Sequence, residues 1–377
     1  MQVLYEGAIF QIMPYGGVAR YFTELINRLP GDVRPTVLGP VQSDARPSGL
    51  RHPSLDYQGI RTKPAVKWAA KAWRPFQHRR IKTTIDQSDA QLVHWTYFRG
   101  LCKRPIQRSR QPLVITLYDF IHEAFPDSDP GGKHHRIKMQ AIDVADRICC
   151  ISQTTYDELC QRHPSAAKRA SITPLGSGLE DVAPAELPSE LTDRPYLLFV
   201  GRRDSYKDFA TMWQAWNNAK ANIPETALVV VGPPMRGREA ETLRWDEADE
   251  RVKLYANVSD SLLKTLYRHS SAFVFPSRME GFGLPILEAM NQDAPVIASN
   301  CAAFREVAGP AAYFFDCGNS DELSDLLTAA GNDQLLDREG RRELGRQQAA
   351  KFTWENTAAT TIDVYRSVLS DQQRHVA

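Results

Sequence analysis

Two glutamates, Glu280 and Glu288, stand on either side of a glycine-rich turn and are the residues best suited to bind a ligand. The apolar segment 272–275 before them predicts a buried strand, and Pro285 predicts the start of a helix, since proline is favoured in the first turn. Glycines at such a junction let backbone amides approach a ligand, and the helix start offers unpaired N–H groups that attract anions. The segment therefore predicts an anion site, with both carboxylates placed to accept hydrogen bonds from nearby hydroxyl groups.

A phosphate flanked by hydroxyl groups is the layout of a sugar nucleotide. A glycine-proline turn between a strand and a helix is also common in α/β domains, where nearby glutamates are usually solvated. The run from Glu280 to Met290, E-G-F-G-L-P-I-L-E-A-M, followed by A-P-V-I-A-S, nevertheless resembles the signature of retaining glycosyltransferases of family four. That family includes bacterial mannosyltransferases and related enzymes of lipopolysaccharide and exopolysaccharide synthesis.

A second group of candidate residues is basic and follows the predicted strand 196–200. Sugar transfer from a nucleotide builds negative charge on the departing diphosphate, so preorganised cations should supply much of the catalysis. The resemblance implies that Arg202 and Lys207 bind this diphosphate, Arg202 as a fork and Lys207 as a compact charge. Taken alone, the segment is also typical of a solvated basic loop. Arg203 is the doubtful member, because two adjacent side chains seldom point at one target.

The resemblance also assigns roles around the glutamate pair. Glu288 is expected to accept from the ribose hydroxyls, and Glu280 is expected nearer the transferred sugar. Asn257 and Val258 resemble the loop that meets the nucleobase. The backbone amides of the turn are expected to contact sugar or phosphate: Gly281, Phe282, Gly283 and Leu284.

The first half of the chain carries a glycine pair, Gly16 and Gly17, at a predicted strand-to-helix junction. In the family, a glycine loop at this position approaches the donor phosphate or the acceptor. Tyr118-Asp119 resembles a strand end where many relatives have His-Asp, so any role of that histidine side chain is in doubt, whereas Asp119 could orient acceptor or sugar hydroxyls. Two histidines could also line the site, although a structural role is the favoured interpretation of each: His94 and His122.

We predict no metal site and no other cofactor. Asp127-Ser128-Asp129 resembles the D-x-D metal motif of another glycosyltransferase fold, but it lies in a Pro/Gly loop and does not follow a strand, which favours a solvated turn. His134 and His135 lack partners at metal-ligand spacing. No Ser-His-Asp arrangement is apparent. Retaining transfer in the family is generally described as a front-face reaction in which the leaving phosphate helps to deprotonate the acceptor, so no base residue is required.

These residues need two domains to position them, since 377 residues exceed one ordinary core. Short apolar runs alternate with amphipathic stretches in both halves, as in parallel β-α-β units. The resemblance implies the GT-B fold, with two doubly wound Rossmann-like domains facing an interdomain cleft. We expect one domain at 1–185, a nucleotide-sugar domain at 190–355 and a C-terminal helix within 356–377 that crosses back. The predicted strands are 3–5, 36–38, 92–94, 113–118, 147–151, 196–200, 227–231, 252–254, 272–275 and 295–298.

Composition limits the partners. Lys plus Arg number 46 and Asp plus Glu number 45, so net charge gives no support for nucleic-acid binding. The segment from Arg61 to Lys82 is locally basic and contains Trp68 and Trp73, which suits an anionic membrane surface. The alternative is a solvated helix whose tryptophans pack on the core.

Six cysteines without C-x-x-C spacing indicate reduced thiols of a cytoplasmic protein. We expect no leader and no apolar run long enough to span a membrane.

The resemblance implies a retaining, metal-independent hexosyltransferase. Its expected donor is a nucleotide sugar, first GDP-mannose or a derived deoxyhexose, and its expected acceptor is a lipid-linked saccharide or polysaccharide in lipopolysaccharide O-antigen or exopolysaccharide synthesis. Three alternatives remain open: a transferase of the same fold that uses UDP-sugars, a nucleotide-sugar epimerase, and an inactive subunit that binds nucleotide sugars as a scaffold.

Overall fold

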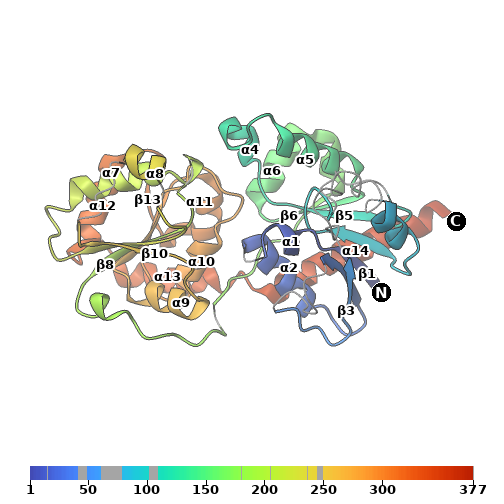
Figure 1. Cartoon of the computed structure of the whole chain (residues 1–377), viewed down its shortest axis with the longest axis horizontal. Coiled ribbons are helices and arrows are strands. Elements are labelled where there is room, and N and C mark those ends of the chain that lie inside the picture. Colours follow the sequence, from blue (N-terminus) through green and yellow to red (C-terminus); the bar gives the residue numbers. More distant parts are fainter. Residues whose placement is uncertain are drawn as a thin grey trace. The chain divides into compact units, whose positions relative to one another are not determined.

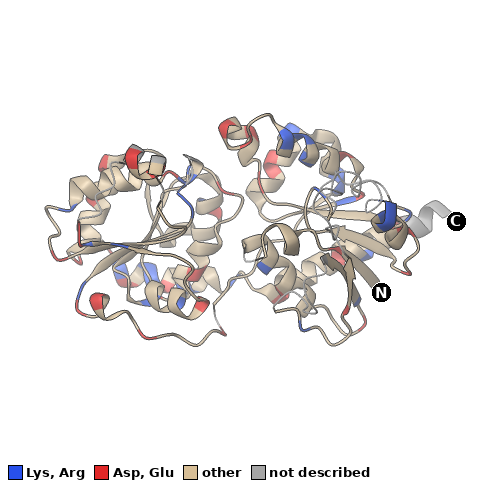
Figure 2. Cartoon of the chain, in the orientation of Figure 1, with Lys and Arg blue, Asp and Glu red and all other residues tan. Residues whose placement is uncertain are grey.

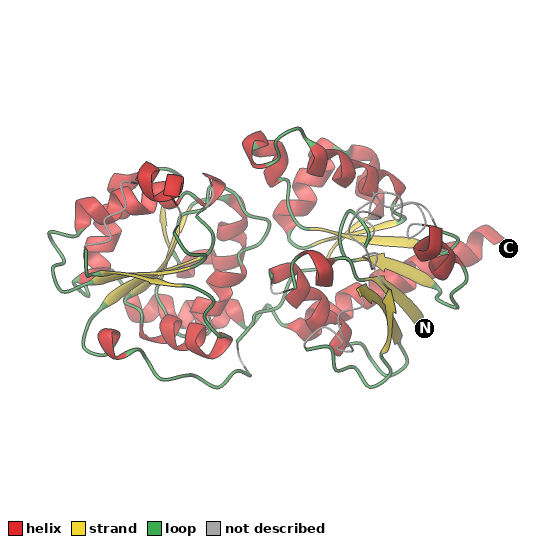
Figure 3. Ribbon diagram, viewed as in Figure 1, coloured by secondary structure: helices red, strands yellow, loops and turns green. Residues whose placement is uncertain are grey.

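The chain forms two compact units in the computed structural model. Unit 1 contains Met1–Gly176 together with Trp354–Ala377, and unit 2 contains Ser177–Thr353. Each unit is an α/β domain with helices on both faces of one sheet, and both units carry basic and acidic side chains (Figures 1, 2 and 3). The structure describes residues 1–14, 16–40, 49–60, 79–101, 109–179, 181–203, 205–235, 237–243 and 249–376.

Unit 1 is built on a parallel sheet of seven strands in the order β3-β2-β1-β4-β5-β6-β7. The central strands are apolar along their length because helices cover both faces, as is typical of parallel sheets. Val3, Leu4, Val93 and Val114 are fully buried. The strands are β1 (Gln2–Glu6), β2 (Arg34–Pro40), β3 (Asp56–Ile60), β4 (Leu92–Trp95), β5 (Leu113–Leu117), β6 (Arg147–Cys150) and β7 (Ala170–Ile172).

The C-terminal helix α14 (Trp354–Val376) completes unit 1 and is drawn red in Figure 1. Its Tyr365 hydroxyl lies 2.6 Å from Nδ1 of His94 and 3.1 Å from the hydroxyl of Tyr5, so the helix is bonded to the strands of this unit. Within the described residues, unit 1 also contains α1 (Ile9–Ile12), α2 (Gly17–Asn27), α4 (Ile121–Ala124), α5 (Lys133–Val144), α6 (Gln153–Arg162) and a helical segment at 79–86.

Unit 2 is built on a parallel sheet of six strands in the order β10-β9-β8-β11-β12-β13. Its core contains Phe199, Trp216 and Val230, each fully buried. The strands are β8 (Tyr196–Val200), β9 (Ala227–Val231), β10 (Val252–Tyr255), β11 (Ala272–Phe275), β12 (Val296–Ser299) and β13 (Tyr313–Phe315).

Residues 177–185 belong to unit 2 because helix α9 holds them by hydrogen bonds. Lys264 Nζ donates to the carbonyl of Val182 at 2.8 Å, and Thr265 Oγ1 donates to the carbonyl of Ala185 at 2.7 Å. The helices of unit 2 are α7 (Phe209–Ala219), α8 (Gly237–Leu243), α9 (Asp260–His269), α10 (Leu284–Met290), α11 (Ala302–Ala308), α12 (Ser320–Gly331) and α13 (Arg338–Ala349).

Each sheet has one point where the chain reverses the order in which it adds strands. In unit 1 this switch lies between β1 and β4, and in unit 2 it lies between β8 and β11. The loops that follow the two strands diverge there and leave a crevice, where ligands of doubly wound folds bind. The switch points therefore decide which loops are candidates for function.

The predicted doubly wound architecture is confirmed, with differences in detail. The sequence prediction omitted β3, β7 and β13. The first of these has the polar sequence D-Y-Q-G-I and is half exposed, and the other two contain three residues each, so their apolar signal is short. Helix α10 begins at Leu284, which puts Pro285 at its second position.

Candidate functional site

Two loops meet at the switch point of unit 2. The β8 loop (residues 201–208) follows β8, and the β11 loop (residues 276–283) follows β11. The first contact between them is an ion pair in which Lys207 Nζ lies 2.5 Å from Oε1 of Glu280. The structure thus brings together two residues that the sequence singled out from segments 73 positions apart.

The Lys207–Glu280 pair is accessible. The two side chains keep 16% and 13% of their surface exposed. Lys207 Nζ also lies 5.3 Å from the ring centroid of Tyr206 and 5.3 Å from that of Phe275, within the range of cation–π attraction. A ligand can therefore reach a lysine whose position is already fixed by a carboxylate and two rings.

A second ion pair joins the same loops and was not predicted from the sequence. Arg278 Nε lies 3.0 Å from Oδ2 of Asp208, and Nη2 lies 3.3 Å from Oδ1. The backbone N–H of Arg278 also donates to the carbonyl of Tyr206 at 2.8 Å. The available signal was weak: an aspartate directly after Lys207 and an arginine two residues before Glu280.

The two arginines of the β8 loop have different surroundings. Arg202 is exposed. Arg203 is 1% exposed at its side chain, and its Nε lies 2.6 Å from Oε1 of Glu239 while Nη2 donates to the carbonyl of Pro233 at 2.7 Å. Arg203 therefore has a structural role, which agrees with the doubt about placing it among the residues that bind the diphosphate.

The turn after Glu280 needs glycine for steric reasons. Gly283 has a φ of 121°, a conformation that other residues rarely adopt, and a Cβ there would lie 3.2 Å from the ring of Phe304. Phe282 is buried, with its ring edge-on to Phe352 at 5.5 Å. The phenylalanine side chain thus anchors the turn in the core, while Gly281 is buried before it and Leu284 starts α10 after it.

Glu288 lies one turn into α10 and is 6% exposed. The hydroxyl of Tyr267, a buried residue of α9, donates to its Oε2 at 3.3 Å. Asn257 and Val258 precede α9, and Asn257 has a left-handed φ of 55°. The predicted nucleotide residues therefore lie on α10 and on the loop before α9, within one unit.

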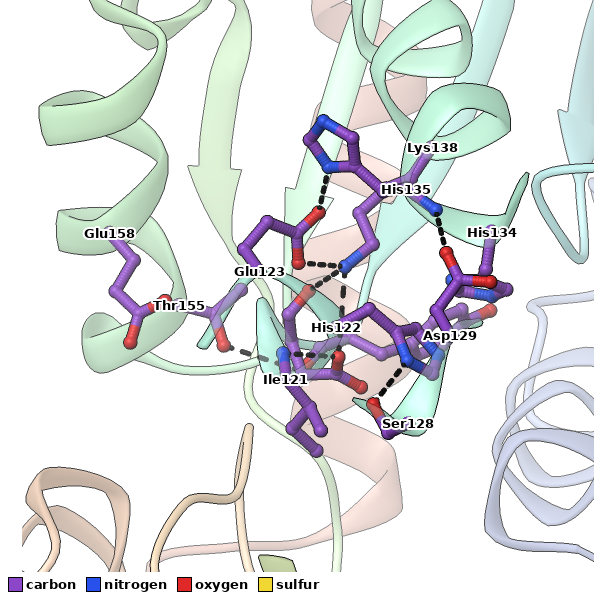
Figure 4. A network of polar contacts seen from close by, with 12 residues as sticks. Ile121, His122, Glu123, Ser128, Asp129, His134, His135, Lys138, Thr155 and Glu158 are labelled. Carbon is purple, nitrogen blue, oxygen red and sulfur yellow. Dashed lines mark hydrogen bonds and ion pairs between the residues drawn. The ribbon is translucent and has the colours of Figure 1, made fainter. Parts of the chain in front are cut away.

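In unit 1, Asp119 follows β5 and is held on two sides. Its Oδ1 accepts from the N–H of Ile121 at 3.0 Å, and Lys138 Nζ donates to its carbonyl at 2.9 Å and lies 3.8 Å from Oδ1. Lys138 is fully buried and lies 2.8 Å from Oε2 of Glu123. Figure 4 shows Lys138 and His135 both reaching from α5 to Glu123. Burial raises the pKa of Glu123, but Lys138 and His135 outweigh it and hold this pKa below its usual value.

Tyr118 and His94 have structural roles. The Tyr118 side chain is buried and its hydroxyl donates to the carbonyl of Thr96 at 2.9 Å. His94 is fully buried, with Nδ1 2.6 Å from the Tyr365 hydroxyl and Nε2 2.9 Å from Thr116 Oγ1. Burial lowers the pKa of His94 to about 3, so the ring is neutral at physiological pH. The favoured interpretation of His94 as a structural histidine is confirmed.

The remaining histidines of unit 1 lie around the Asp127-Ser128-Asp129 turn. His122 Nδ1 lies 2.8 Å from Ser128 Oγ, and its ring centroid lies 4.2 Å from that of His134. Asp129 Oδ2 accepts from the N–H of His135 at 2.9 Å and so caps α5. Among the described residues, no group of three or more His, Cys, Asp or Glu side chains is arranged to hold a metal ion.

The glycine pair lies where α2 begins. Gly16 precedes the helix in an extended conformation, with φ −91° and ψ 166°, and Gly17 is its first residue. A Cβ on Gly16 would meet Met13 at 3.4 Å, which is ordinary contact. The local packing therefore does not require glycine at this position.

The switch point of unit 1 contains a residue that the sequence analysis missed. Glu6, at the end of β1, is fully buried; its Oε1 accepts from the N–H of Leu101 at 2.6 Å and its Oε2 from the N–H of Ala8 at 3.2 Å. Burial raises the pKa of Glu6 to about 8 against the opposing effect of these two hydrogen bonds. The signal in the sequence was a carboxylate inside an apolar strand.

The basic segment from Arg61 to Lys82 lies outside the described residues up to position 78. In its described part, Arg79 and Arg80 are exposed and Ile81 is buried. No helix of the described residues combines the length and the apolar character needed to cross a membrane.

Comparisons with known proteins agree with this geometry. Residues 15–180 match the Glycosyltransferase Family 4 model, and residues 187–351 match the model of Glycosyl transferases group 1. The O-antigen chain mannosyltransferase B of Escherichia coli is 30% identical over 272 residues, which cover 67% of this chain and 70% of that protein.

Two solved structures share the fold. Sucrose-phosphate synthase from Thermosynechococcus elongatus has a TM-score of 0.76 at 21% identity and covers 98% of this chain and 99% of its own. Anabaena HepE, solved in complex with UDP and glucose, has a TM-score of 0.71 at 15% identity and covers 97% and 99%. The two Rossmann-like domains are thus those of the GT-B fold, and the chain belongs to the family-four glycosyltransferases, in the group of the O-antigen mannosyltransferases.

Proposed function

We propose that this glycosyltransferase is a retaining, metal-independent hexosyltransferase that uses GDP-mannose or a derived deoxyhexose nucleotide. The proposed acceptor is a lipid-linked saccharide or polysaccharide in bacterial O-antigen or exopolysaccharide synthesis. The observation that carries the proposal is the accessible Lys207–Glu280 pair at the switch point of unit 2. The choice of sugar rests on the Escherichia coli relative, which is a mannosyltransferase.

The cations of the β8 loop would stabilise the leaving group. When the bond from the anomeric carbon to the diphosphate breaks, negative charge grows on the phosphate oxygens. Lys207 and the exposed Arg202 are suited to balance that charge, and a preorganised cation loses little in reorganisation during the step. The acceptor hydroxyl then attacks from the same face and passes its proton to a leaving phosphate oxygen.

The remaining residues of unit 2 would hold the donor. We assign Glu288 to the ribose hydroxyls, because its carboxylate is already oriented by Tyr267, and Glu280 to the transferred sugar. Val258 would lie at the nucleobase. The amides at the start of α10 would meet sugar or phosphate, as helix starts favour anions: Gly281, Phe282, Gly283 and Leu284.

Unit 1 would serve the acceptor and the far side of the donor. Asp119 Oδ1 accepts from the N–H of Ile121, and its side chain remains 27% exposed, so the carboxylate can also accept from a sugar hydroxyl. Gly17 would offer its backbone N–H at the start of α2, and Gly16, whose own N–H donates to the carbonyl of Met13 at 3.1 Å, would let a ligand approach the backbone closely. We further propose that the segment from Arg61 to Lys82 contacts an anionic membrane surface on the cytoplasmic side.

A nucleotide-release assay tests the proposal. Purified protein is incubated with GDP-, UDP-, ADP- and dTDP-sugars, each with and without mannose-containing acceptors and with and without EDTA. We expect release from GDP-mannose that persists in EDTA, and an axial anomeric linkage in the product by NMR. An inverted linkage or loss of activity in EDTA would contradict the mechanism.

Two other functions make different predictions in the same assay. The UDP bound to Anabaena HepE, a protein with the same fold, makes a UDP-sugar donor the second candidate, and release from UDP-sugars alone would favour it. A donor that binds by thermal shift but is never cleaved would favour a scaffold subunit, since ligand binding raises apparent stability without chemistry. Conversion of the donor to its epimer would favour an epimerase.

A further inference from the structure

We infer that the Arg278–Asp208 ion pair is a positioning device for the donor site: it fixes the β8 loop against the β11 loop, and thereby places Lys207 where the diphosphate leaves. The inference rests on the proposed function and deepens it by adding two residues outside the recognised motif. Neither residue is proposed to touch the substrate.

The position of the pair in the chain supports this role. Asp208 directly follows Lys207, and Arg278 stands two residues before Glu280. The two ion pairs, together with the 2.8 Å hydrogen bond from the Arg278 N–H to the Tyr206 carbonyl, join the same short segments of the two loops. A shift of Arg278 relative to the β8 loop would therefore move Asp208, and with it Lys207, the residue directly before Asp208.

The two ion pairs differ in how much geometry each can fix. The Lys207 ammonium is a compact charge, and its 2.5 Å contact with Oε1 of Glu280 sets a distance more than an orientation. Arg278 meets Asp208 through two contacts, Nε to Oδ2 at 3.0 Å and Nη2 to Oδ1 at 3.3 Å, which fix orientation as well as distance. The arginine pair is thus the better device for holding the two loops in one relative orientation.

The backbone of Asp208 is arranged for this contact. Its φ is 50°, in the left-handed region, and its carbonyl accepts from Thr211 and Met212 at the start of α7. Asparagine and aspartate tolerate this conformation better than other residues with a side chain. Asp208 is also only 4% exposed, so its carboxylate is shielded from solvent, whereas the Arg278 side chain is 48% exposed. The sequence thus accepts an uncommon backbone conformation at the residue that pairs with Arg278.

The test uses five variants of the whole chain: Arg278→Gln, Asp208→Asn, their combination, and Lys207→Met with and without Arg278→Gln. Asparagine retains the left-handed backbone of Asp208 and removes only its charge. We measure nucleotide release from GDP-mannose for kcat and KM, GDP-mannose affinity by calorimetry, and Tm. Arg346→Gln is the matched control, because it breaks another arginine–aspartate pair of unit 2, 2.6 Å from Nη1 to Asp293 Oδ1.

Arg278→Gln and Asp208→Asn should each lower kcat about 10- to 100-fold, since small misplacements of catalytic groups have effects of this size. The Arg278→Gln, Asp208→Asn double variant should be no slower than the slower single, because both changes break one contact. In the Lys207→Met background, Arg278→Gln should lower kcat by less than about a further threefold, because the group that Arg278 positions is already absent. Arg346→Gln should match the wild type.

Three results would overturn the inference. The first is an unchanged kcat in Arg278→Gln while the wild type turns over. The second is a full additional loss from Arg278→Gln in the Lys207→Met background, which would mean that Arg278 acts independently. The third is a loss of kcat that follows only from a lower Tm, so that the variant reaches the wild-type kcat when it is assayed at a temperature below its unfolding transition. A wild type that binds the nucleotide but releases none from any donor would instead contradict the proposed function.

Discussion

The switch points of the two units are closed in different ways. In unit 1, one buried carboxyl group, that of Glu6, accepts hydrogen bonds from the loops after β1 and β4. In unit 2, two ion pairs join the loops after β8 and β11, and Lys207, Glu280 and Arg278 all keep part of their surface exposed. The same topological position is therefore a buried contact between two loops in unit 1 and a partly exposed group of charges in unit 2.

The difference explains why donor chemistry is assigned to unit 2. The carboxyl group of Glu6 is fully buried, so its hydrogen bonds are shielded from a ligand. The Lys207–Glu280 pair keeps 16% and 13% of its side-chain surface exposed, so an incoming phosphate can reach it and take the place of one partner. Unit 1 instead presents Asp119, one strand away from its switch point.

A second contrast concerns two lysine–glutamate pairs. Lys207 and Glu280 in unit 2 are 16% and 13% exposed, whereas Lys138 and Glu123 in unit 1 are 0% and 7% exposed. A pair that is buried and bonded to a carbonyl holds structure, because its charges cannot be satisfied by water. The predictions below use this contrast, with function expected to depend on the first pair and stability on the second.

The largest effect is expected for Lys138→Met. Removing this cation leaves Glu123 with only His135 as a partner, and breaking one side of a buried pair costs about 3 to 5 kcal/mol. Lys207→Met should cost less than Lys138→Met, since water reaches the Lys207–Glu280 pair more easily. Urea unfolding of both variants measures the difference. Equal destabilisation would remove the contrast between the pairs, and Lys138→Met with Glu123→Gln should recover part of the loss.

Lys207→Met should have the larger effect on turnover. Loss of a preorganised group that stabilises developing charge lowers kcat about 100- to 1000-fold, measured as nucleotide release at saturating donor. Lys207→Arg keeps the charge but changes its shape and should recover only part of the rate. A kcat within threefold of the wild type in Lys207→Met would show that the pair is structural here too.

Glu288→Ala should mainly weaken donor binding. A hydrogen bond to a charged group contributes about 1.5 to 3 kcal/mol, which corresponds to roughly a 10- to 150-fold rise in the donor Kd, measured by calorimetry. Tyr267→Phe is the matched control, since it removes only the hydroxyl that contacts Oε2 of Glu288. An unchanged Kd in Glu288→Ala would contradict its assignment to the ribose.

The sequence predicted the parts of the site that lie close together along the chain. The bounds of β8, β9 and β11 were predicted without error, and the motif after β11 identified Glu280 and Glu288. Their patterns are local, since apolar runs mark strands and a Gly-Pro turn marks a helix start.

Contacts between distant segments could not be predicted in the same way. Arg278 and Asp208 are 70 positions apart, and Glu6 and Leu101 are 95 apart. Neither spacing carries a periodic signal, and each residue type is common on surfaces. Their partners follow only from the strand order, which places β8 beside β11 and β1 beside β4.

The last effect is a dependence of stability on pH, expected from Glu6, and it is small over any single pH unit. Its pKa is about 8 in the folded protein against 4.5 for an ordinary glutamate, because burial disfavours the charged form. The folded state thus holds this proton more tightly than the unfolded chain. The stabilising contribution is complete below pH 4.5 and is lost as pH rises toward 8, with a slope of about 1.4 kcal/mol per pH unit.

Glu6→Gln should abolish this slope, because glutamine does not titrate in this range. Urea unfolding of unit 1 at pH 5.5, 6.5 and 7.5 should show the wild type losing stability relative to the variant by about 1.4 kcal/mol at each step. Glutamine also replaces one accepting oxygen of Glu6 by an amide NH2 group, so one of the two N–H donors loses its acceptor. This lowers the stability of the variant by the same amount at every pH. Asp89→Asn, at an exposed position of the same unit, controls for the removal of one carboxylate and should show no such trend. Parallel curves for the wild type and Glu6→Gln would mean that the loops at this switch point open enough for water to solvate the carboxylate, and the contrast with unit 2 would then be one of degree.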